Sequence, residues 1–343
     1  MGTISDGAPM SGSSGSGAGP HLVLVGPTAS GKSELALTLA RRHRDLEIVS
    51  VDSMQVYRGM DVGTAKPTAA ERADVPHHLL DLADPDETFS VARFQAAARQ
   101  AVAAIEGRGH RALLVGGTGL YVQAVVDDLA VPGEWPMIRL ALEVEADDDL
   151  PALYAELAQA DPTAAGRIEP GNRRRIVRAL EVVRGSGRPF SSFGPGVGAY
   201  PPTPFRLAGI DLPRPVRAER IAARLRTQLA AGFLDEVAAL AARPGGLSRT
   251  ARQALGYREL LAHLAGELAL DEAVDLIERR TRAFARRQQA WFRRDPRITW
   301  LPGPSGPRSG EPGQSPAELL EPLEDWMQCD SPSITAGATT SSS

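Results

Sequence analysis

One short motif in this 343-residue chain suggests phosphate chemistry. Gly26-Pro-Thr-Ala-Ser-Gly-Lys-Ser33 fits G-x-x-x-x-G-K-[ST], and it lies between an apolar run at residues 22–25 and a helical pattern at 34–41. In such a loop the backbone N–H groups surround phosphate oxygens, the lysine adds a full charge and the hydroxyl can bind Mg²⁺. The predicted diphosphate or nucleotide site is therefore Gly26, Pro27, Thr28, Ala29, Ser30, Gly31, Lys32 and Ser33, with Ser33 as the metal ligand.

Lysine is rare in this chain, which makes its two positions informative. Of the 38 basic residues 36 are arginine, and the two lysines are Lys32 and Lys66. A compact ammonium on a flexible stem is not interchangeable with a guanidinium, so we expect each lysine to mark a place where that shape is required. Lys66 lies in the turn-forming segment 63–67, where a solvated loop lysine and a phosphate partner are equally open interpretations.

A second group of candidate residues follows two other apolar strands. Ordinary phosphate-loop NTPases hold Mg²⁺ with an Asp at the end of a second strand, but here the run 111–115 ends in Gly116-Gly-Thr. Asp52 is the acid that directly follows the apolar run 46–51, and it could bind metal through water, act as a general base or cap a turn. Thr118 could hydrogen bond a leaving phosphate or merely close its turn.

The elements that must position these residues alternate between strand and helix. Strands at 22–25, 46–51 and 111–115, with a helix at 91–106, predict an α/β fold with a parallel sheet. Ligands of such folds bind beyond the carboxyl ends of the strands, where residues 26–33, Asp52 and residues 116–119 would converge.

Helices dominate the rest of the chain. We expect them at 136–146, 150–159, 173–184 with Asn172 as N-cap, 216–231, 234–242, 257–264 and 271–294, with a strand at 205–211. In the last helix Ile277, Phe284 and Trp291 recur every seven residues and predict its core-facing stripe. The predicted organisation is a disordered segment 1–20, a first part of the core 21–131, an inserted helical lobe 132–204, core completion with arginine-rich C-terminal helices 205–301, and a mostly disordered tail 302–343 with a short helix at 316–327.

Charge is distributed unevenly along the chain. The net charge is −4, but residues 1–166 carry 12 basic and 23 acidic groups, whereas residues 167–297 carry 25 and 13. A phosphate-binding first half joined to a basic second part suggests a small phosphorylated ligand and a polyanion, although arginines on solvated helix faces would give the same count. The single cysteine, Cys329, excludes an intramolecular disulfide, and the absence of an apolar leader or membrane-length run predicts a cytoplasmic protein without membrane contact.

Residues 21–301 resemble bacterial tRNA dimethylallyltransferase, also called tRNA isopentenyltransferase. The matching segments, in the order of that family, are GPTASGKS, SVDSMQVYRGMDVGTAKPT, PHHLLD, LLVGGTGLYVQA, RRIVRALEV, GYREL and RRQQAWFRR. The resemblance implies a P-loop NTPase-like core and transfer of a dimethylallyl group from dimethylallyl diphosphate to N6 of adenine 37, in tRNAs that read codons beginning with U. Diphosphate is released, Mg²⁺ is the implied cofactor, and the partner is the anticodon stem-loop of tRNA, bound by a monomer.

The resemblance also assigns roles to single residues. Asp52 corresponds to the base that accepts the N6 proton of an extruded adenine, Thr118 to a residue beside the reacting groups, and Arg214 to an arginine that contacts the diphosphate, with Arg217 as the other possible register. Gln253 stands where some members have arginine. The implied tRNA contacts are Asp52, Ser53, Met54, Gln55, Thr118, Arg139, Arg174, Arg175, Ile176, Val177, Arg178, Gly256, Tyr257, Arg258, Arg286, Arg287, Gln288, Gln289, Trp291 and Arg293.

Two other functions use the same residues. A small-molecule kinase would place ATP in the 26–33 loop, and an RNA-binding protein could carry that loop as a vestige. The missing acid after residues 111–115 and the separate basic region argue against the kinase, while the intact Lys32-Ser33 pair and Asp52 argue against a vestigial site.

Overall fold

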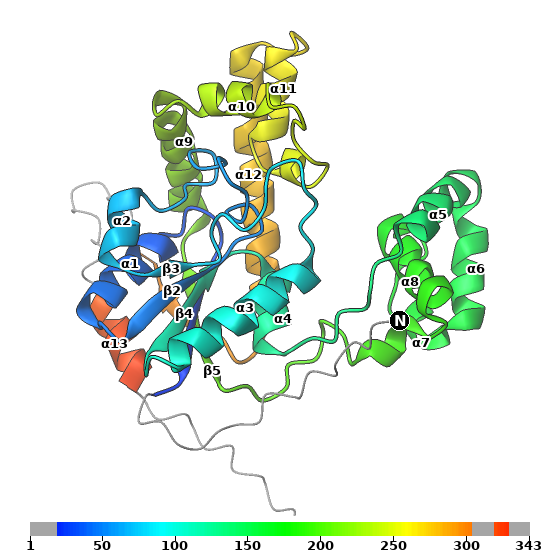
Figure 1. The fold of residues 1–343 in the computed structure, drawn as a ribbon, viewed down its shortest axis with the longest axis horizontal. Coiled ribbons are helices and arrows are strands. Elements are labelled where there is room, and N and C mark those ends of the chain that lie inside the picture. Colours follow the sequence, from blue (N-terminus) through cyan, green and yellow to red (C-terminus); the bar gives the residue numbers. More distant parts are fainter. Residues whose placement is uncertain (1–18, 304–318, 329–343) are drawn as a thin grey trace, which may run out of the picture.

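The core of the protein is a parallel sheet. The computed structural model describes residues 19–303 and 319–328, and within them six parallel strands form one sheet in the order β3-β2-β4-β1-β5-β6 (Figure 1). The strands are β1 (His21–Val25), β2 (Leu46–Val51), β3 (His77–His78), β4 (Arg111–Gly116), β5 (Phe205–Asp211) and β6 (Thr299–Pro302). The predicted α/β class with a P-loop NTPase-like sheet is confirmed.

Helices cover both faces of this sheet, because alternate strand residues point to opposite sides. Leu22 and Leu24 pack in one apolar cluster with α1 (Lys32–Arg42) and α13 (Leu320–Gln328). Val23 and Val25 belong to the opposite cluster, which includes α3 (Val91–Glu106) and α4 (Gly119–Val126). Burial on both faces explains why the strands read as continuous apolar runs.

The register of the strands aligns the loops that carry the candidate site. Val25 of β1 and Val51 of β2 both pair with Gly116 of β4, so the three loops leave the sheet at the same level. Gly116 has no room for a side chain, since a Cβ there would lie 2.0 Å from the Val51 carbonyl oxygen. The predicted convergence at the carboxyl edge is therefore a consequence of pairing.

A second group of helices packs over this edge (Figure 1). It comprises α9 (Arg214–Ala230), α10 (Phe233–Ala241), η2 (Ala251–Gln253), α11 (Tyr257–Leu264) and α12 (Leu270–Phe292). The buried residues of α12 are Ala273, Ile277, Ala285, Gln288 and Phe292. The predicted stripe holds for Ile277, which is buried, and for Trp291, which is partly exposed but packs against the apolar core; Phe284 is partly exposed and does not belong to that core.

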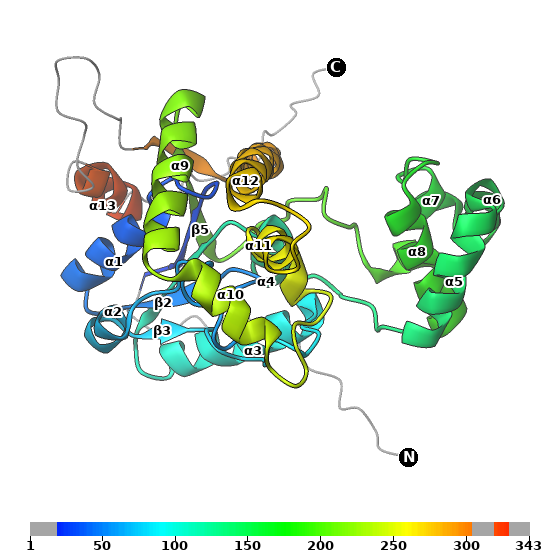
Figure 2. The same ribbon diagram turned by 90° about the horizontal axis from the view of Figure 1, so that it is seen from above.

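The inserted lobe has a hydrophobic core of its own and lies apart from the sheet in both views (Figures 1 and 2). It contains α5 (Pro136–Asp148), α6 (Leu150–Ala160), α7 (Pro162–Ala165), α8 (Arg173–Ser186) and η1 (Phe190–Phe193). The Asn172 side chain accepts a hydrogen bond from the Arg175 amide, as expected of an N-cap. Arg297 ties the two linkers of the lobe to the core, since Nη1 donates to Asp127 Oδ1 and to the Pro201 carbonyl, both at 2.6 Å.

The remaining expectations concern the ends of the chain and short elements. Most of the predicted disordered segments, and Pro316, lie outside the described residues. The tail nevertheless contributes α13 to the core, and β6 extends to Pro302, one residue into the predicted tail. The part of the chain that forms the sheet also contains two short helices. They are α2 (Ala69–Asp74) and α4, which was not predicted and whose apolar sequence follows the glycine-rich loop. Among the described residues no helix combines the length and apolarity needed to cross a membrane.

Candidate active site

The 26–33 segment folds as a compact loop between β1 and α1. Gly31 has φ = 89°, a conformation that disfavours side chains, and the Ser30 amide donates to the Pro27 carbonyl at 3.2 Å. A Cβ on Gly26 would lie 2.8 Å from Ser30 Oγ, so this glycine is needed for the close approach. The loop thus leads directly into the N-terminus of α1, where backbone N–H groups and the helix dipole favour an anion.

Lys32 brings the principal charge of this loop. Loss of hydration on burial is the main reason that its pKa falls to about 8; the Asp52 carboxylate opposes the shift and Arg224 adds to it. In the structure its Nζ has a long contact of 3.4 Å to the Pro27 carbonyl. An ammonium that is poorly hydrated and weakly bonded is well prepared for an anionic ligand.

Arg224 is a site residue that sequence reasoning missed. From α9 it donates to Thr28 Oγ1 and to the Thr64 carbonyl, each at 3.4 Å, and burial lowers its pKa while Asp52 opposes that shift. Its spacing of seven residues from Arg217 on one helix was the available signal, since residues seven apart share a helix face. Lys32 and Arg224 therefore both lie near enough to Asp52 to interact with its charge.

Asp52 begins a turn that Thr118 holds. The Met54 amide donates to Asp52 Oδ1 at 2.8 Å, and the Ser53 amide donates to Thr118 Oγ1 at 3.2 Å. Within the described residues the second carboxylate oxygen of Asp52 has no hydrogen-bond partner, and the residue is partly exposed. The structure brings together Asp52, Ser53 and Thr118 as predicted, and leaves one carboxylate oxygen available to a substrate.

Gln288 joins the two glycine-rich loops. Its Oε1 accepts the Thr28 amide at 2.8 Å, and its Nε2 donates to the Gly117 carbonyl at 2.9 Å. The side chain is buried and connects the two loops, while the predicted tRNA contact of Gln288 stays a prediction. Trp291, one turn further along α12, lies against Gly119, where a Cβ would be 2.3 Å from the indole.

Arg214 lies in a pocket of about 370 Å³ beside α12. Its lining includes Arg286, Arg293, Asp211 and Gln289. Within the described residues neither Arg214 nor Arg217 hydrogen bonds to residues 26–33; buried Arg217 donates to Gln289 Oε1 at 2.6 Å. The role of Arg214 toward a diphosphate stays a prediction.

The predicted tRNA contacts fall into three groups by exposure. Exposed side chains are those of Arg174, Arg175, Arg258, Arg286, Arg287 and Arg293, and partly exposed ones are Met54, Gln55, Arg139, Arg178, Gln289 and Trp291. Arg139 and Arg178 both pair with the fully buried Glu181 of the lobe. Ile176, Val177, Gly256, Tyr257 and Gln288 are buried, and their contacts with tRNA stay a prediction.

Comparison with known proteins agrees with this geometry. Residues 55–295 match the model of the family described as IPP transferase. The chain belongs to the IPP transferase family. It is 52% identical over 293 residues to a tRNA dimethylallyltransferase of Kineococcus radiotolerans, which covers 84% of this chain and 92% of the relative. It is also 52% identical to the enzyme of that name from Streptomyces coelicolor, with 82% and 90% covered.

Solved structures of the family have the same fold. A tRNA isopentenylpyrophosphate transferase from Bacillus halodurans aligns with a TM-score of 0.64 at 36% identity, covering 90% of this chain and 96% of that one. A eukaryotic dimethylallyltransferase, described as acting on tRNA, aligns with a TM-score of 0.68 at 25% identity, covering 83% and 74%. Family membership identifies the chain as a transferase and disfavours the kinase alternative.

Proposed function

We propose that this enzyme transfers a dimethylallyl group from dimethylallyl diphosphate to N6 of adenine 37 in tRNAs that read U-starting codons. The bond from the allylic carbon to the bridging diphosphate oxygen breaks, and a bond from that carbon to N6 forms. One N6 proton passes to Asp52, and the electron pair of the broken bond leaves with diphosphate. The observation that carries this proposal is that Asp52, at the carboxyl end of β2, interacts electrostatically with Lys32 of the phosphate-binding loop and with Arg224, which hydrogen bonds to Thr28 of that loop.

The leaving group requires positive charge where negative charge develops. Lys32 and Arg224 supply two cations, and the N-terminus of α1 supplies backbone N–H groups. Gln288 engages the Thr28 amide and so helps hold the loop in the shape that receives the diphosphate. Groups that the fold holds around the phosphate loop would reduce the reorganisation needed in the transition state.

The acceptor requires a base and a turn that can face a nucleobase. The Met54 amide orients the Asp52 carboxylate through one oxygen, and the other oxygen is left for the N6 proton. Thr118 lies beside it through its contacts with Ser53. An adenine must leave its stack to reach this turn, as in other enzymes that act on a base.

The rest of the tRNA is an anion that the arginine-rich surfaces fit. Exposed Arg174 and Arg175 begin α8 in the lobe, and Arg286, Arg287 and Arg293 lie on α12 in the core. Neutralisation of backbone phosphates by these residues would supply salt-dependent affinity, whereas base recognition falls to the Asp52 turn. The lobe and the core thus offer two contact surfaces for one stem-loop.

The residues present also fit a magnesium ion that arrives with the donor. The described residues contain no cluster of three or more His, Cys, Asp or Glu side chains suited to a metal, and Ser33 is exposed at the first turn of α1. Mg²⁺ commonly takes few protein ligands beside phosphate oxygens and water, so Ser33 would be its protein ligand. When bound, it would neutralise charge on the departing diphosphate.

Replacing Asp52 by Asn tests the proposal. With radiolabelled dimethylallyl diphosphate and an unmodified tRNA transcript, loss of the base should lower turnover by ~10²-fold or more and leave tRNA affinity nearly intact. Asp74→Asn is a matched control, because Asp74 is a surface carboxylate paired with Arg41. Unchanged turnover in Asp52→Asn would refute the assigned role, and wild-type protein that labels no tRNA but hydrolyses ATP would refute the function.

A further inference from the structure

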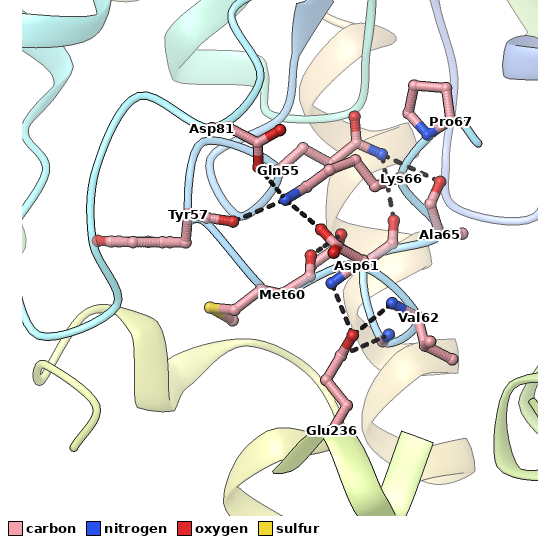
Figure 3. Close-up of polar contacts among 12 residues, drawn as sticks. Gln55, Tyr57, Met60, Asp61, Val62, Ala65, Lys66, Pro67, Asp81 and Glu236 are labelled. Atoms are coloured by element: carbon pink, nitrogen blue, oxygen red, sulfur yellow. Dashed lines mark hydrogen bonds and ion pairs between the residues drawn. The ribbon is translucent and has the colours of Figure 1, made fainter. Parts of the chain in front are cut away.

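The second lysine of the chain lies in a buried polar cluster. The Lys66 side chain is fully excluded from solvent, and its Nζ lies 2.6 Å from Asp61 Oδ1, 2.7 Å from Asp81 Oδ1 and 2.7 Å from the Tyr57 carbonyl oxygen (Figure 3). Both expectations for Lys66, a solvated loop residue or a phosphate partner, are therefore wrong. Local sequence could not show this, because Asp81 lies 15 residues away along the chain.

The three contacts suit an ammonium group in particular. An ammonium has three hydrogens on one nitrogen, and here three acceptors surround that nitrogen. A guanidinium spreads its donors over a larger plane and would not fit the same enclosed space. In a chain with 36 arginines, this geometry accounts for a lysine at position 66.

The cluster is also balanced in charge. Arg72 Nη1 donates to the second oxygen of Asp81 at 2.7 Å, so two cations face the two carboxylates of Asp61 and Asp81. Burial alone would raise the pKa of Asp81, but hydrogen bonds from Lys66 and Arg72 outweigh it and hold that pKa below its usual value. Asp81 is therefore a fixed anion between two partners.

Gln55 is hydrogen bonded to Asp81 and to the two residues that precede Lys66. The Asp81 amide donates to the Gln55 carbonyl at 3.3 Å, and the Gln55 side-chain amide donates to the Thr64 and Ala65 carbonyls, both at 3.2 Å. Ser50 donates to the remaining side-chain oxygen at 2.7 Å. Both ends of the Gln55 side-chain amide and its backbone carbonyl are thus hydrogen bonded, so Gln55 is held in place by its neighbours.

Gln55 directly follows Met54, whose amide hydrogen bonds to the Asp52 carboxylate and orients it. A series of contacts therefore connects Lys66, through Asp81 and Gln55, to the carboxylate of Asp52, the proposed proton acceptor. Each step is a hydrogen bond or a peptide bond, so a shift at Lys66 displaces the 52–55 turn.

A separate anchor holds the 61–63 segment. Glu236 of α10 accepts the amides of Asp61, Val62 and Gly63 at 2.8, 2.7 and 3.1 Å, and Tyr257 donates to it at 2.6 Å. The phosphate loop is held independently by Gln288. Loss of the Lys66 contacts should therefore leave the 61–63 segment and the phosphate loop in place.

We propose that Lys66 is a positioning residue for the base-accepting turn. It touches neither substrate, and through Asp81 and Gln55 it sets the orientation of the Asp52 carboxylate toward adenine. The proposal rests on the function proposed above.

The test compares Lys66→Arg and Lys66→Met in the full-length chain. Because misplacement by ~1 Å can cost ~10²-fold, single-turnover prenyl transfer at saturating substrates should slow by ~10- to ~100-fold. Affinity for dimethylallyl diphosphate, measured without tRNA, should change less than about twofold because the phosphate loop has its own supports. Arg58→Met is the matched control, since Arg58 is an exposed cation of the same loop paired with Asp84.

Four outcomes of this experiment decide whether Lys66 positions the turn, is merely structural, or belongs to a protein of another function. An unchanged transfer rate in Lys66→Arg, beside an active wild type, would overturn the proposal alone. Donor affinity and melting temperature that fall together with the rate would also overturn it, because they indicate a merely structural role. If neither Lys66 variant folds, Asp81→Asn keeps the shape of the cluster and must show the same split, a slow transfer rate with normal donor affinity. Failure of the wild type and of Arg58→Met to transfer the group would instead contradict the proposed function.

Discussion

Donor binding should depend on pH through Lys32. The pKa of this lysine is lowered to about 8, mainly by burial. The protonated form attracts diphosphate, so affinity is fully present below pH 8 and is lost as pH rises through that value. At pH 9, one unit above the pKa, ~10% of the free enzyme is protonated, and affinity should be ~10-fold lower than at pH 7, or ~1.4 kcal/mol.

Calorimetric titration of dimethylallyl diphosphate in the absence of tRNA measures this effect directly. Its terminal phosphate should titrate near pH ~6, as phosphate esters do, so the donor's own charge is nearly constant over the range. Titration at pH 8 in buffers of different ionisation enthalpy should show uptake of about half a proton, because the bound anion stabilises the ammonium.

Two variants make this reasoning refutable. Lys32→Met should bind weakly and with no pH dependence from 7 to 9.5. Lys32→Arg should also show none, because arginine stays charged, but it should bind more weakly than wild type at pH 7, since a guanidinium does not fit the position of the ammonium. A wild-type affinity that is flat over this range, or a Lys32→Met slope equal to that of wild type, would show that Lys32 does not carry the charge that holds the donor.

Two further predictions concern arginines. Arg224→Gln should weaken donor binding by ~10-fold, about the loss of one charge-assisted contact, and Arg226→Gln, an exposed neighbour on α9, should not; equal affinities for both variants would remove Arg224 from the site. Changing Arg286 and Arg293 to Gln should reduce the slope of log affinity for tRNA against log salt by ~1 to ~2, measured by filter binding. An unaltered slope would make these two residues a solvated face.

Sequence reasoning was most successful where the signal is local. The phosphate loop is a contiguous pattern between a strand and a helix, and the strand 46–51 that ends before Asp52 is a continuous apolar run. The prediction that the phosphate loop and Asp52 lie near Thr118 followed from a general property of parallel sheets. The register of the strands brings these segments to the same level. The motif order that indicated the family was likewise readable along the chain.

Sequence reasoning was less successful in predicting which side chains of a helix face the core. The heptad of Ile277, Phe284 and Trp291 predicted a core stripe on α12, but Phe284 does not belong to the core, and the unpredicted Ala285 and Gln288 are buried. A motif that matches tRNA-contacting segments cannot tell which of its residues turn inward, as Ile176 and Val177 do on α8.

The amino-acid order by itself determined the parallel α/β core, the phosphate loop and the position of a carboxylate at a strand end, because each depends on residues close together in the chain. Only the tertiary structure decided which side chains complete the site. The amide of Gln288 meets Thr28 across 260 residues, and Arg224 meets it across 196. Lys66 contacts Asp81, which lies 15 residues further along the chain, because the segment between them folds back. Such contacts depend on how helices and loops pack over the sheet edge, and no local sequence pattern predicts that packing.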